Sequence, residues 1–331
     1  MNQVDLITDS ALMPPNHLVE PVAWSGHIPF AMWLVEQLKP KLVVELGTHT
    51  GNSYFAFCQS VQTNGLNSHC YAVDTWLGDE HVGRYDGDEV YAQVSAVNQE
   101  RYAGFSRLLR MTFDEALVHF NDDSIDLLHI DGLHTYEAVQ HDFETWRAKL
   151  SDRSVVLFHD INVRQADFGV WRLWEELSTE YPNLSFDHSH GLGVLFTGKQ
   201  QMQPMLKLLE DYASEQGARK IRNCFERLGF GLSTLLESRQ RANHLENHIS
   251  HLDNKINHLN QKIEHLNQKN NHLNQKVQHL DERNKNYHLK VVTLNDKINQ
   301  LNDVLAEMMS SRSWKMTKPL RSVGQLLRRL K

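Results

Sequence analysis

Apolar residues follow two different patterns along the 331-residue chain. In residues 1–199, short apolar runs, several ending in an acidic residue, alternate with longer stretches that have a helical period. The short runs are typical of buried strands, and the longer stretches are typical of helices. The pattern predicts an α/β fold with a doubly wound, mostly parallel sheet of seven strands. The strands should begin at Leu42, His69, Ser106, Ser124, Ser154, Leu184 and Gly193.

Helices should separate these strands. The glycine-punctuated polar stretch Gly78–Gly87 instead predicts a long loop, either a lid over a site or a simple surface loop. Residues 200–241 should form two helices with a break at Gly217. The other predicted helices are His27–Leu38, Tyr54–Val61, Glu137–Lys149 and Val170–Tyr181.

A second pattern begins at Ala242, where apolar residues recur every seven positions through Met308. Isoleucine or valine predominates at heptad position a and leucine at position d, which favours a parallel two-stranded coiled coil. Asn270 and Asn284, both at position a, should fix the register across a homodimer. The rod, residues 242–309, would be roughly 100 Å long.

Histidines also recur at heptad position c of this segment. Position c faces solvent, and residues seven apart on a helix are separated by two turns, about 10 Å. Metal ligands must lie closer together than that, so repetition of a His-Leu-Asn-Gln-Lys unit, rather than metal binding, is the expected origin of this series. Its members are His244, His251, His258, His265, His272 and His279.

These patterns predict five parts. They are a helical cap (1–40), a ligand-binding α/β domain (41–199), a helical connector (200–241), the coiled coil (242–309) and a basic tail (310–331).

The tail is basic and amphipathic. Residues 312–331 contain seven lysines and arginines and no acidic residue, and Trp314 lies near their start. One helical face would carry Leu320, Val323, Leu327 and Leu330. The segment suits an anionic membrane surface or an acidic protein partner, or else it is a frayed, solubilising end.

Composition limits the location and the partners. The net charge of −7 gives no reason to expect nucleic acid binding. Cys58, Cys70 and Cys224 lack C-x-x-C spacing, which favours reduced thiols. The sequence shows neither a signal peptide nor an apolar run of about 18 residues. We therefore expect a cytoplasmic protein.

The strongest candidate site follows the first predicted strand. Glu45, Gly47 and Gly51 form a Glu-x-Gly-x-x-x-Gly pattern before a predicted helix. Glycines let a backbone approach a ligand, and the free N–H groups of a helix start attract negative charge. Glu45 would repel a pyrophosphate but would attract an α-ammonium group. The alternative is a strand–turn–helix that binds nothing.

Further polar residues should reach the same edge of the sheet. Asp74 ends the second strand and suits a ribose diol, since a carboxylate accepts from both hydroxyls. Asp114 could cap the helix after the third strand, with Phe113 placed to touch an adenine. The fourth and fifth strands end in Asp131 and in His159-Asp160, and ligands of such sheets bind beyond these strand ends.

Several motifs, in order, resemble those of one family. Residues 20–198 resemble a bacterial S-adenosylmethionine (SAM) dependent methyltransferase family of class I, the "methyltransferase 24" group, which often occurs in surface-polysaccharide clusters. The matching segments are His27–Phe30, Val44–Gly51, Tyr71–Trp76, His129–Glu137, Phe158–Asp160 and Gly191–Val194.

The resemblance implies O-methyl transfer from SAM. Gly47 to Gly51, including Thr48, would hold the methionine part and Asp74 the ribose, and Trp76, Phe113 and Asp114 would complete the cofactor site. The placement of Asp131 and Asp160 resembles that in metal-dependent O-methyltransferases of the catechol type, which implies a shared cation such as Mg²⁺. Those enzymes have Asn where this chain has Ile161, and Asn162, one place later, is the candidate third ligand.

Deprotonation of a hydroxyl could instead use a general base. His134, beside Asp131, is the first candidate and His159 the second.

The appendage resembles that of bacterial O-antigen chain-terminating methyltransferases. This resemblance implies a glycan acceptor, with the coiled coil as a spacer and the tail 312–331 docked on a glycosyltransferase or on the inner face of the cytoplasmic membrane. A non-catalytic coiled-coil adaptor with a degenerate head and a methyltransferase of small molecules are the alternatives. The absent Gly-x-Gly-x-x-Gly motif argues against a dehydrogenase or sugar epimerase.

Overall fold

The structure is a computed structural model that describes residues 4–78, 86–317 and 319–321. The chain divides into two compact units, Met1–Ala242 and Asn243–Lys331. Most of the predicted loop Gly78–Gly87 and the end of the basic tail lie outside the described residues. Within the described ranges, no helix combines the length and apolar character needed to cross a bilayer.

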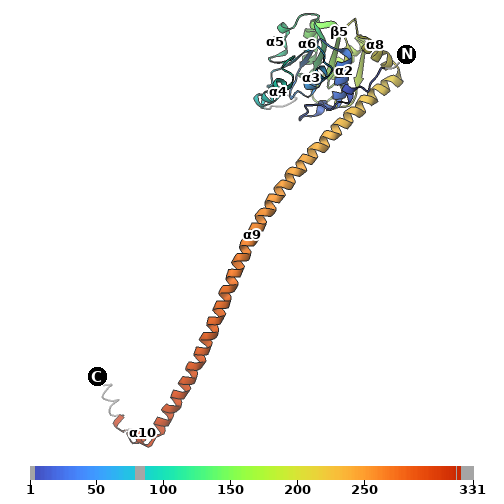
Figure 1. The fold of residues 1–331 in the computed structure, drawn as a ribbon. Helices are drawn as coiled ribbons and strands as arrows, with labels where there is room; N and C mark the ends of the chain where they lie inside the picture. The colour runs from blue at the N-terminus through green and yellow to red at the C-terminus, as the bar shows by residue number, and fades with distance from the viewer. Residues whose placement is uncertain (1–3, 79–85, 318, 322–331) are drawn as a thin grey trace. The chain divides into compact units, whose positions relative to one another are not determined.

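A seven-stranded sheet in the order β3-β2-β1-β4-β5-β7-β6 forms the centre of the first unit (Figure 1). The first five strands pair in parallel, and β7 runs antiparallel to both of its neighbours. The predicted doubly wound, mostly parallel sheet is therefore confirmed. The strands are β1 (Leu42–Leu46), β2 (His69–Asp74), β3 (Ser106–Arg110), β4 (Ile125–Ile130), β5 (Leu150–His159), β6 (Asn183–Phe186) and β7 (Leu192–Phe196).

Helices cover both faces of the sheet. Successive strand residues point to opposite sides, and both sides carry apolar residues that the helices bury. Val43 belongs to a buried cluster with the helices α2, α3 and α8 and with the start of α9. Val44 belongs to the cluster on the other face, with α6 and α7. The helices are α1 (Asp9–Leu12), α2 (Ile28–Leu38), α3 (Asn52–Thr63), α4 (Gly87–Arg101), α5 (Phe113–Ala116), α6 (Tyr136–Trp146), α7 (Val170–Glu180), α8 (Gln203–Tyr212), α9 (Glu215–Ser310) and α10 (Arg312–Met316), with short 3₁₀ turns at Ala23–His27, Leu117–His119 and Arg147–Lys149.

Two local predictions were wrong. The break between α8 and α9 consists of Ala213 and Ser214, and the Oγ of Ser214 accepts from the N–H of Gly217 at 3.0 Å and so caps α9. Gly217 lies inside the first turn of α9, where a side chain would collide with the carbonyl of Asp211. Helix α5 is capped by Thr112, in a capping box with Glu115, and not by Asp114.

The second unit contains the long part of α9 and the short helix α10. The heptad positions a and d are exposed in the single chain, with Leu245 at 59% and Ile263 at 55%. The helix predicted over residues 242–309 is present, whereas its pairing with a second copy stays a prediction. Within the described part of the tail, the Arg321 guanidinium lies over the indole ring of Trp314, 3.6 Å from its centroid.

Candidate active site

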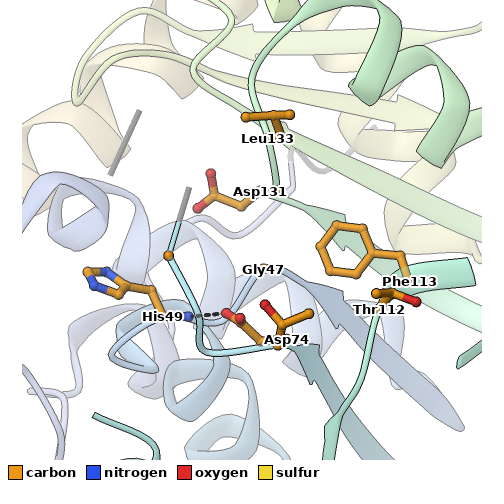
Figure 2. A pocket seen from close by; sticks show the side chains of 10 residues that line it. Gly47, His49, Asp74, Thr112, Phe113, Asp131 and Leu133 are labelled. Atoms are coloured by element: carbon orange, nitrogen blue, oxygen red, sulfur yellow. Dashed lines mark hydrogen bonds between the residues drawn. The ribbon is translucent and has the colours of Figure 1, made fainter. Parts of the chain in front are cut away.

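Asp74 anchors the glycine-containing loop that joins β1 to α3. Its Oδ2 accepts from the backbone N–H of His49 (Figure 2) and from that of Thr48, both at 2.8 Å. Its Oδ1 accepts from the backbone N–H of Trp76 at 2.6 Å. A carboxylate has about four acceptor positions, so three are occupied. Asp74 can therefore accept from one ligand hydroxyl rather than from the predicted pair.

Trp76 supports this loop and is absent from the walls of the two cavities beside it. Its side chain is fully buried, and its Nε1–H donates to the carbonyl of His49 at 2.8 Å. The residue has a φ of 52°, a left-handed conformation that is uncommon for a large side chain. The predicted cofactor contact of Trp76 is thus replaced by an indirect role, in which the indole fixes His49.

A cavity of about 230 Å³ lies beside the loop. Gly47, Asp74, Phe113, Asp131 and Leu133 lie on its walls (Figure 2). The aromatic ring of Phe113 is therefore available to an adenine, as the sequence predicts.

Asp114 does not reach this cavity. Its carboxylate accepts a hydrogen bond from His141 at 2.9 Å and is 62% exposed. As the second residue of α5, Asp114 points away from Phe113, which starts that helix on the cavity wall. The prediction of Asp114 as a cofactor residue was wrong for this arrangement.

A larger cavity of about 690 Å³ adjoins the first and shares Gly47, His49 and Asp131 with it. Thr48 lies on its wall, and the buried Oγ1 of Thr48 has no hydrogen-bond partner among the described residues. Helix α3 begins at the same wall with no side-chain cap. An unpartnered hydroxyl and free helix N–H groups together suit a carboxylate.

Both glycines of the loop have left-handed backbones, with φ of 86° at Gly47 and 83° at Gly51. A side chain at Gly47 would collide with the backbone of Asp131, and one at Gly51 would collide with the ring of Phe55. Gly47 lines both cavities, whereas Gly51 lines neither and forms the N-terminal cap of α3.

Glu45 lies beneath the loop, fully buried, and is on the wall of neither cavity. Its Oε2 is 2.8 Å from Nδ1 of His129, whose Nε2 accepts from the indole N–H of Trp24 at 3.2 Å. His129 therefore donates through Nδ1 to the carboxylate. Burial raises the pKa of Glu45, and hydrogen bonding to His129 and Ser53 opposes that shift. Glu45 thus ties β1 to β4 through Oε2, and its predicted contact with an α-ammonium group stays a prediction.

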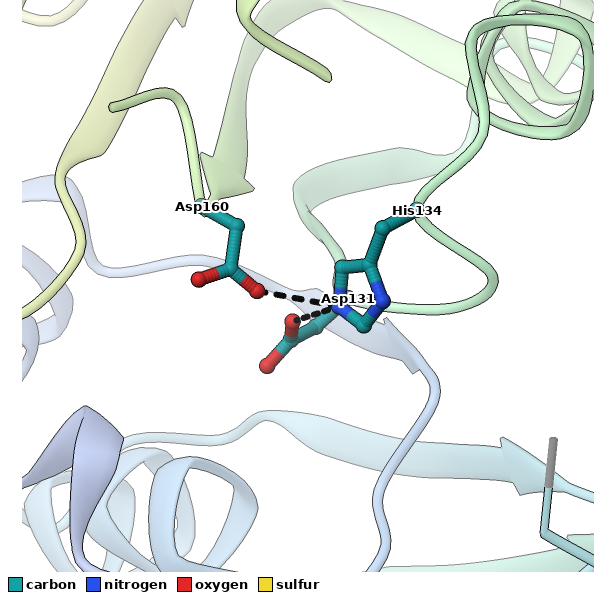
Figure 3. A group of neighbouring side chains, drawn as sticks. All are labelled: Asp131, His134 and Asp160. Carbon is teal, nitrogen blue, oxygen red and sulfur yellow. Dashed lines mark ion pairs between the residues drawn. The ribbon is translucent and has the colours of Figure 1, made fainter. Parts of the chain in front are cut away.

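Three ligand-type side chains converge where β4 and β5 end. One donor atom each from Asp131, His134 and Asp160 lies within 4.8 Å of the others (Figure 3). Nε2 of His134 is 3.0 Å from Asp160 Oδ2 and 3.6 Å from Asp131 Oδ1. The ring of His134 also stacks on Phe168, with centroids 4.8 Å apart. This group lies on the wall of the larger cavity.

His159 also pairs with both carboxylates. Its Nδ1 is 3.3 Å from Asp131 Oδ1 and 3.4 Å from Asp160 Oδ2, and its Nε2 lies 3.0 Å from the carbonyl oxygen of Ser189. A carbonyl only accepts, so Nε2 carries a proton, and Nδ1 needs a second proton to face the carboxylates. His159 is therefore an imidazolium.

The electrostatics of the cluster overturn the prediction of a free base. Burial lowers the pKa of His134 and of His159, but the charges and hydrogen bonds of Asp131 and Asp160 outweigh it and raise the two values to about 9 and about 10. Burial conversely raises the pKa of each aspartate, but the histidines hold both below the usual range. Both imidazoles hold protons at neutral pH, so neither is a ready proton acceptor.

Asn162, the third predicted metal ligand, lines the larger cavity. Its side-chain amide donates to the backbone and side chain of Asp187 at 3.3 and 3.4 Å. His134, in the loop that follows β4, belongs to the compact group with Asp131 and Asp160 instead. A metal role for Asn162 stays a prediction.

Sequence reasoning missed His190 and His27. His190, 59% exposed, places Nδ1 3.2 Å from Asp160 Oδ1. Buried His27 donates through Nε2 to the carbonyl of Ser189 at 3.1 Å, beside the donor of His159. Ser189 and His190 both have left-handed φ, 48° and 68°. The sequence shows histidines around the last two predicted strands. Their approach to the end of β5 could not be predicted, because it depends on the turn between β6 and the antiparallel strand β7.

Residues 44–161 match the family model described as "Methyltransferase domain". This segment is therefore similar to a methyltransferase domain. The match agrees with the predicted family and enzyme class, and the SAM cofactor stays a prediction. A protein of Sinorhizobium fredii (strain NBRC 101917 / NGR234), y4gI, is 54% identical over 199 residues. These residues cover 59% of this chain and 22% of that protein, so the chain matches about a fifth of the length of its relative.

Solved structures are similar at low identity. CalS11, a TDP-rhamnose 3'-O-methyltransferase of calicheamicin biosynthesis, is 17% identical with a TM-score of 0.41, and the match covers 52% of this chain and 78% of that one. The O-methyltransferase TomG of Streptomyces achromogenes is 13% identical with a TM-score of 0.39, and the match covers 57% of this chain and 94% of that one.

Proposed function

We propose that residues 41–199 transfer a methyl group from SAM to a hydroxyl oxygen of a glycan. The observation that carries the proposal is the position of Asp131, which lines both cavities and belongs to the compact group with His134 and Asp160. A cofactor in the first cavity and an acceptor in the second would thus meet at that group.

The residues present fit SAM. Phe113 and Leu133 offer apolar surface to an adenine, and the remaining acceptor position of Asp74 suits one ribose hydroxyl. The unpartnered hydroxyl of Thr48 and the uncapped start of α3 suit the carboxylate of the methionine part. Gly47, His49 and Asp131 line both cavities, so a ligand that extends from one into the other would lie against them.

SAM supplies an electrophilic methyl group on a sulfonium, so a C–O bond forms as the C–S bond breaks. The acceptor hydroxyl must also lose a proton. His134 and His159 hold protons of their own, whereas Asp131 and Asp160 are ionised. The chain therefore contributes two carboxylates, Asp131 and Asp160, that orient the hydroxyl and accept its hydrogen bond. One of them takes the proton as the C–O bond forms, and the sulfonium leaves as a neutral thioether.

The group also fits a divalent cation. Two carboxylates and one imidazole form a mixed oxygen–nitrogen set, which suits Mn²⁺ or Fe²⁺ better than Mg²⁺, whose preferred ligands are all oxygens. Asp131, Asp160 and His134, the last after loss of its proton, would hold the ion, and the ion would lower the pKa of the acceptor hydroxyl. This set modifies the Mg²⁺ set predicted from the sequence, in which Asn162 was the third ligand.

We propose further that the acceptor is a lipid-linked surface polysaccharide. Exposed heptad positions over 242–309 support a parallel homodimer and a rod that spaces the domain from its attachment. The tail 312–331 would attach to an anionic lipid surface or to a glycosyltransferase at the inner face of the cytoplasmic membrane.

Transfer of labelled methyl from SAM to a panel of bacterial surface glycans tests the proposal. Phe113→Ala removes the ring on the cofactor wall and should weaken SAM binding by about tenfold or more, since a buried aromatic contributes at least 1.4 kcal/mol. Val118→Ala is the matched control, because Val118 follows closely in the chain but is 83% exposed. Equal SAM affinity in the two variants would remove the first cavity from the proposal.

A further inference from the structure

One heptad of α9 breaks the charge pattern of the coiled-coil segment. Position g is lysine or arginine in every heptad from Lys255 to Lys297, but in the heptad before them it is His248. The neighbouring c positions are His244 and His251. This exception creates a His-x-x-x-His-x-x-His sequence within α9.

The spacing places three imidazoles on one face of the helix. His248 is four residues after His244 and three residues before His251, and such residues are neighbours on a helix surface, with Cβ atoms about 5 to 6 Å apart. The other c-position histidines differ. His258, for example, is followed four residues later by Lys262. A histidine of that kind has no second imidazole within one turn.

The three rings are free to move. All three residues are exposed, and among the described residues no hydrogen bond or ion pair of their rings is found. Their donor atoms are not preassembled, since the compact group found in the described part of the chain is Asp131, His134 and Asp160. Exposed side chains on a formed helix can converge by rotation about their side-chain bonds, without a change in the backbone.

We propose that His244, His248 and His251 form a second metal site, which takes a divalent ion that prefers imidazole, such as Ni²⁺, Cu²⁺ or Zn²⁺. His248 is its central member, because it neighbours both other rings. Two histidines at i and i+4 on a helix are an established arrangement for zinc, and imidazole suits nickel and copper as well. Water would complete the coordination. A bound ion would join successive turns and stabilise α9 where the second unit begins.

The test is calorimetric titration of the full chain with NiCl₂, using protein made without a histidine tag. His248→Gln should bind one Ni²⁺ fewer per chain, or bind it about 10² times more weakly, because the chelating second ligand is lost. His258→Gln is the matched control, since it removes an exposed c-position histidine whose i+4 neighbour is lysine. The control should bind as the unmodified chain does.

A second measurement separates this site from the group in the first unit. Ni²⁺ should raise the helical melting temperature followed by circular dichroism in the unmodified chain and in Asp160→Asn, but not in His248→Gln. Equal stoichiometry and affinity in the unmodified chain and His248→Gln would overturn the proposal. An equal loss in His258→Gln would do the same, because it would assign binding to the whole histidine series.

Discussion

Replacing Asp74 with asparagine should loosen the loop between β1 and α3. The carboxylate accepts three backbone hydrogen bonds, two at Oδ2 from Thr48 and His49 and one at Oδ1 from Trp76. Asparagine has one acceptor oxygen and one donor nitrogen. The best orientation keeps the pair at Thr48 and His49 and directs the side-chain NH₂ at the N–H of Trp76.

The expected cost follows from these contacts. A hydrogen bond to a charged group contributes about 1.5 to 3 kcal/mol, and asparagine loses one such bond, loses the charge on the other two and faces one donor with another. We expect the free energy of unfolding to fall by about 2 to 3 kcal/mol, which corresponds to a decrease of about 4 to 12 °C in melting temperature for a unit of this size. SAM affinity should fall about 10- to 100-fold, because the acceptor for the ribose hydroxyl is removed as well.

Calorimetry provides both readouts, scanning for the melting temperature and titration for SAM. Asp88→Asn is the matched control. Asp88 is 85% exposed and pairs with Arg110 at 2.6 Å, so its loss should cost less than about 1 kcal/mol. If Asp74→Asn melts within the range of this control and binds SAM equally well, the anchoring role of the carboxylate is refuted. A stability loss with unchanged SAM affinity would refute the ribose contact alone.

Three further predictions concern other parts of the chain. Gly47→Ala should destabilise the first unit by about 1 to 3 kcal/mol or more, because φ is positive and a Cβ would meet the backbone of Asp131, so the scanning calorimeter should show a lower melting temperature even without SAM. The pKa values of His134 and His159 lie above the usual 6.5, so their stabilisation is complete below pH 6.5 and disappears as pH rises through about 9 to 10; a melting temperature that did not fall over that range would contradict the imidazolium assignment. Asn270→Val should raise the melting temperature of the coiled coil but admit other oligomeric states, and light scattering that finds the unmodified chain monomeric would exclude the dimer.

Most of the fold could be predicted from the sequence, because strand and helix periods differ and the strands end in polar residues. The exceptions have local causes. The first residues of β5, Ser151 to Arg153, are polar and were not recognised as strand. Helix α4 buries only Val94 and Asn98, so it has little apolar periodicity. Gly217 is a helix breaker by propensity, but close packing on Asp211 requires a glycine there.

The candidate site could be located but not described. Parallel strand ends share one edge, so the meeting of Asp131 and Asp160 followed from topology. The protonation of the histidines could not be predicted in this way, because it depends on distances near 3 Å between residues far apart in sequence, such as His159 and Ser189. Asp74 faces a cavity, whereas Glu45 is buried beneath the loop. This difference depends on the neighbouring helices and strands, so the pattern of a single strand does not predict it.

Transfer of labelled methyl from SAM to glycan hydroxyls by the unmodified chain and by Asp160→Asn tests the central claim most directly. Asp160 should be required, because it pairs with His134 and belongs to the only compact ligand group found in the described residues. Asp187→Asn is the control, because Asp187 accepts a hydrogen bond from Asn162 but does not belong to that group. We predict transfer by the unmodified chain and the control, and a rate lower by about 10² to 10⁴ in Asp160→Asn. Undiminished transfer by Asp160→Asn, with SAM bound equally well, would contradict the assignment of this group as the reaction centre.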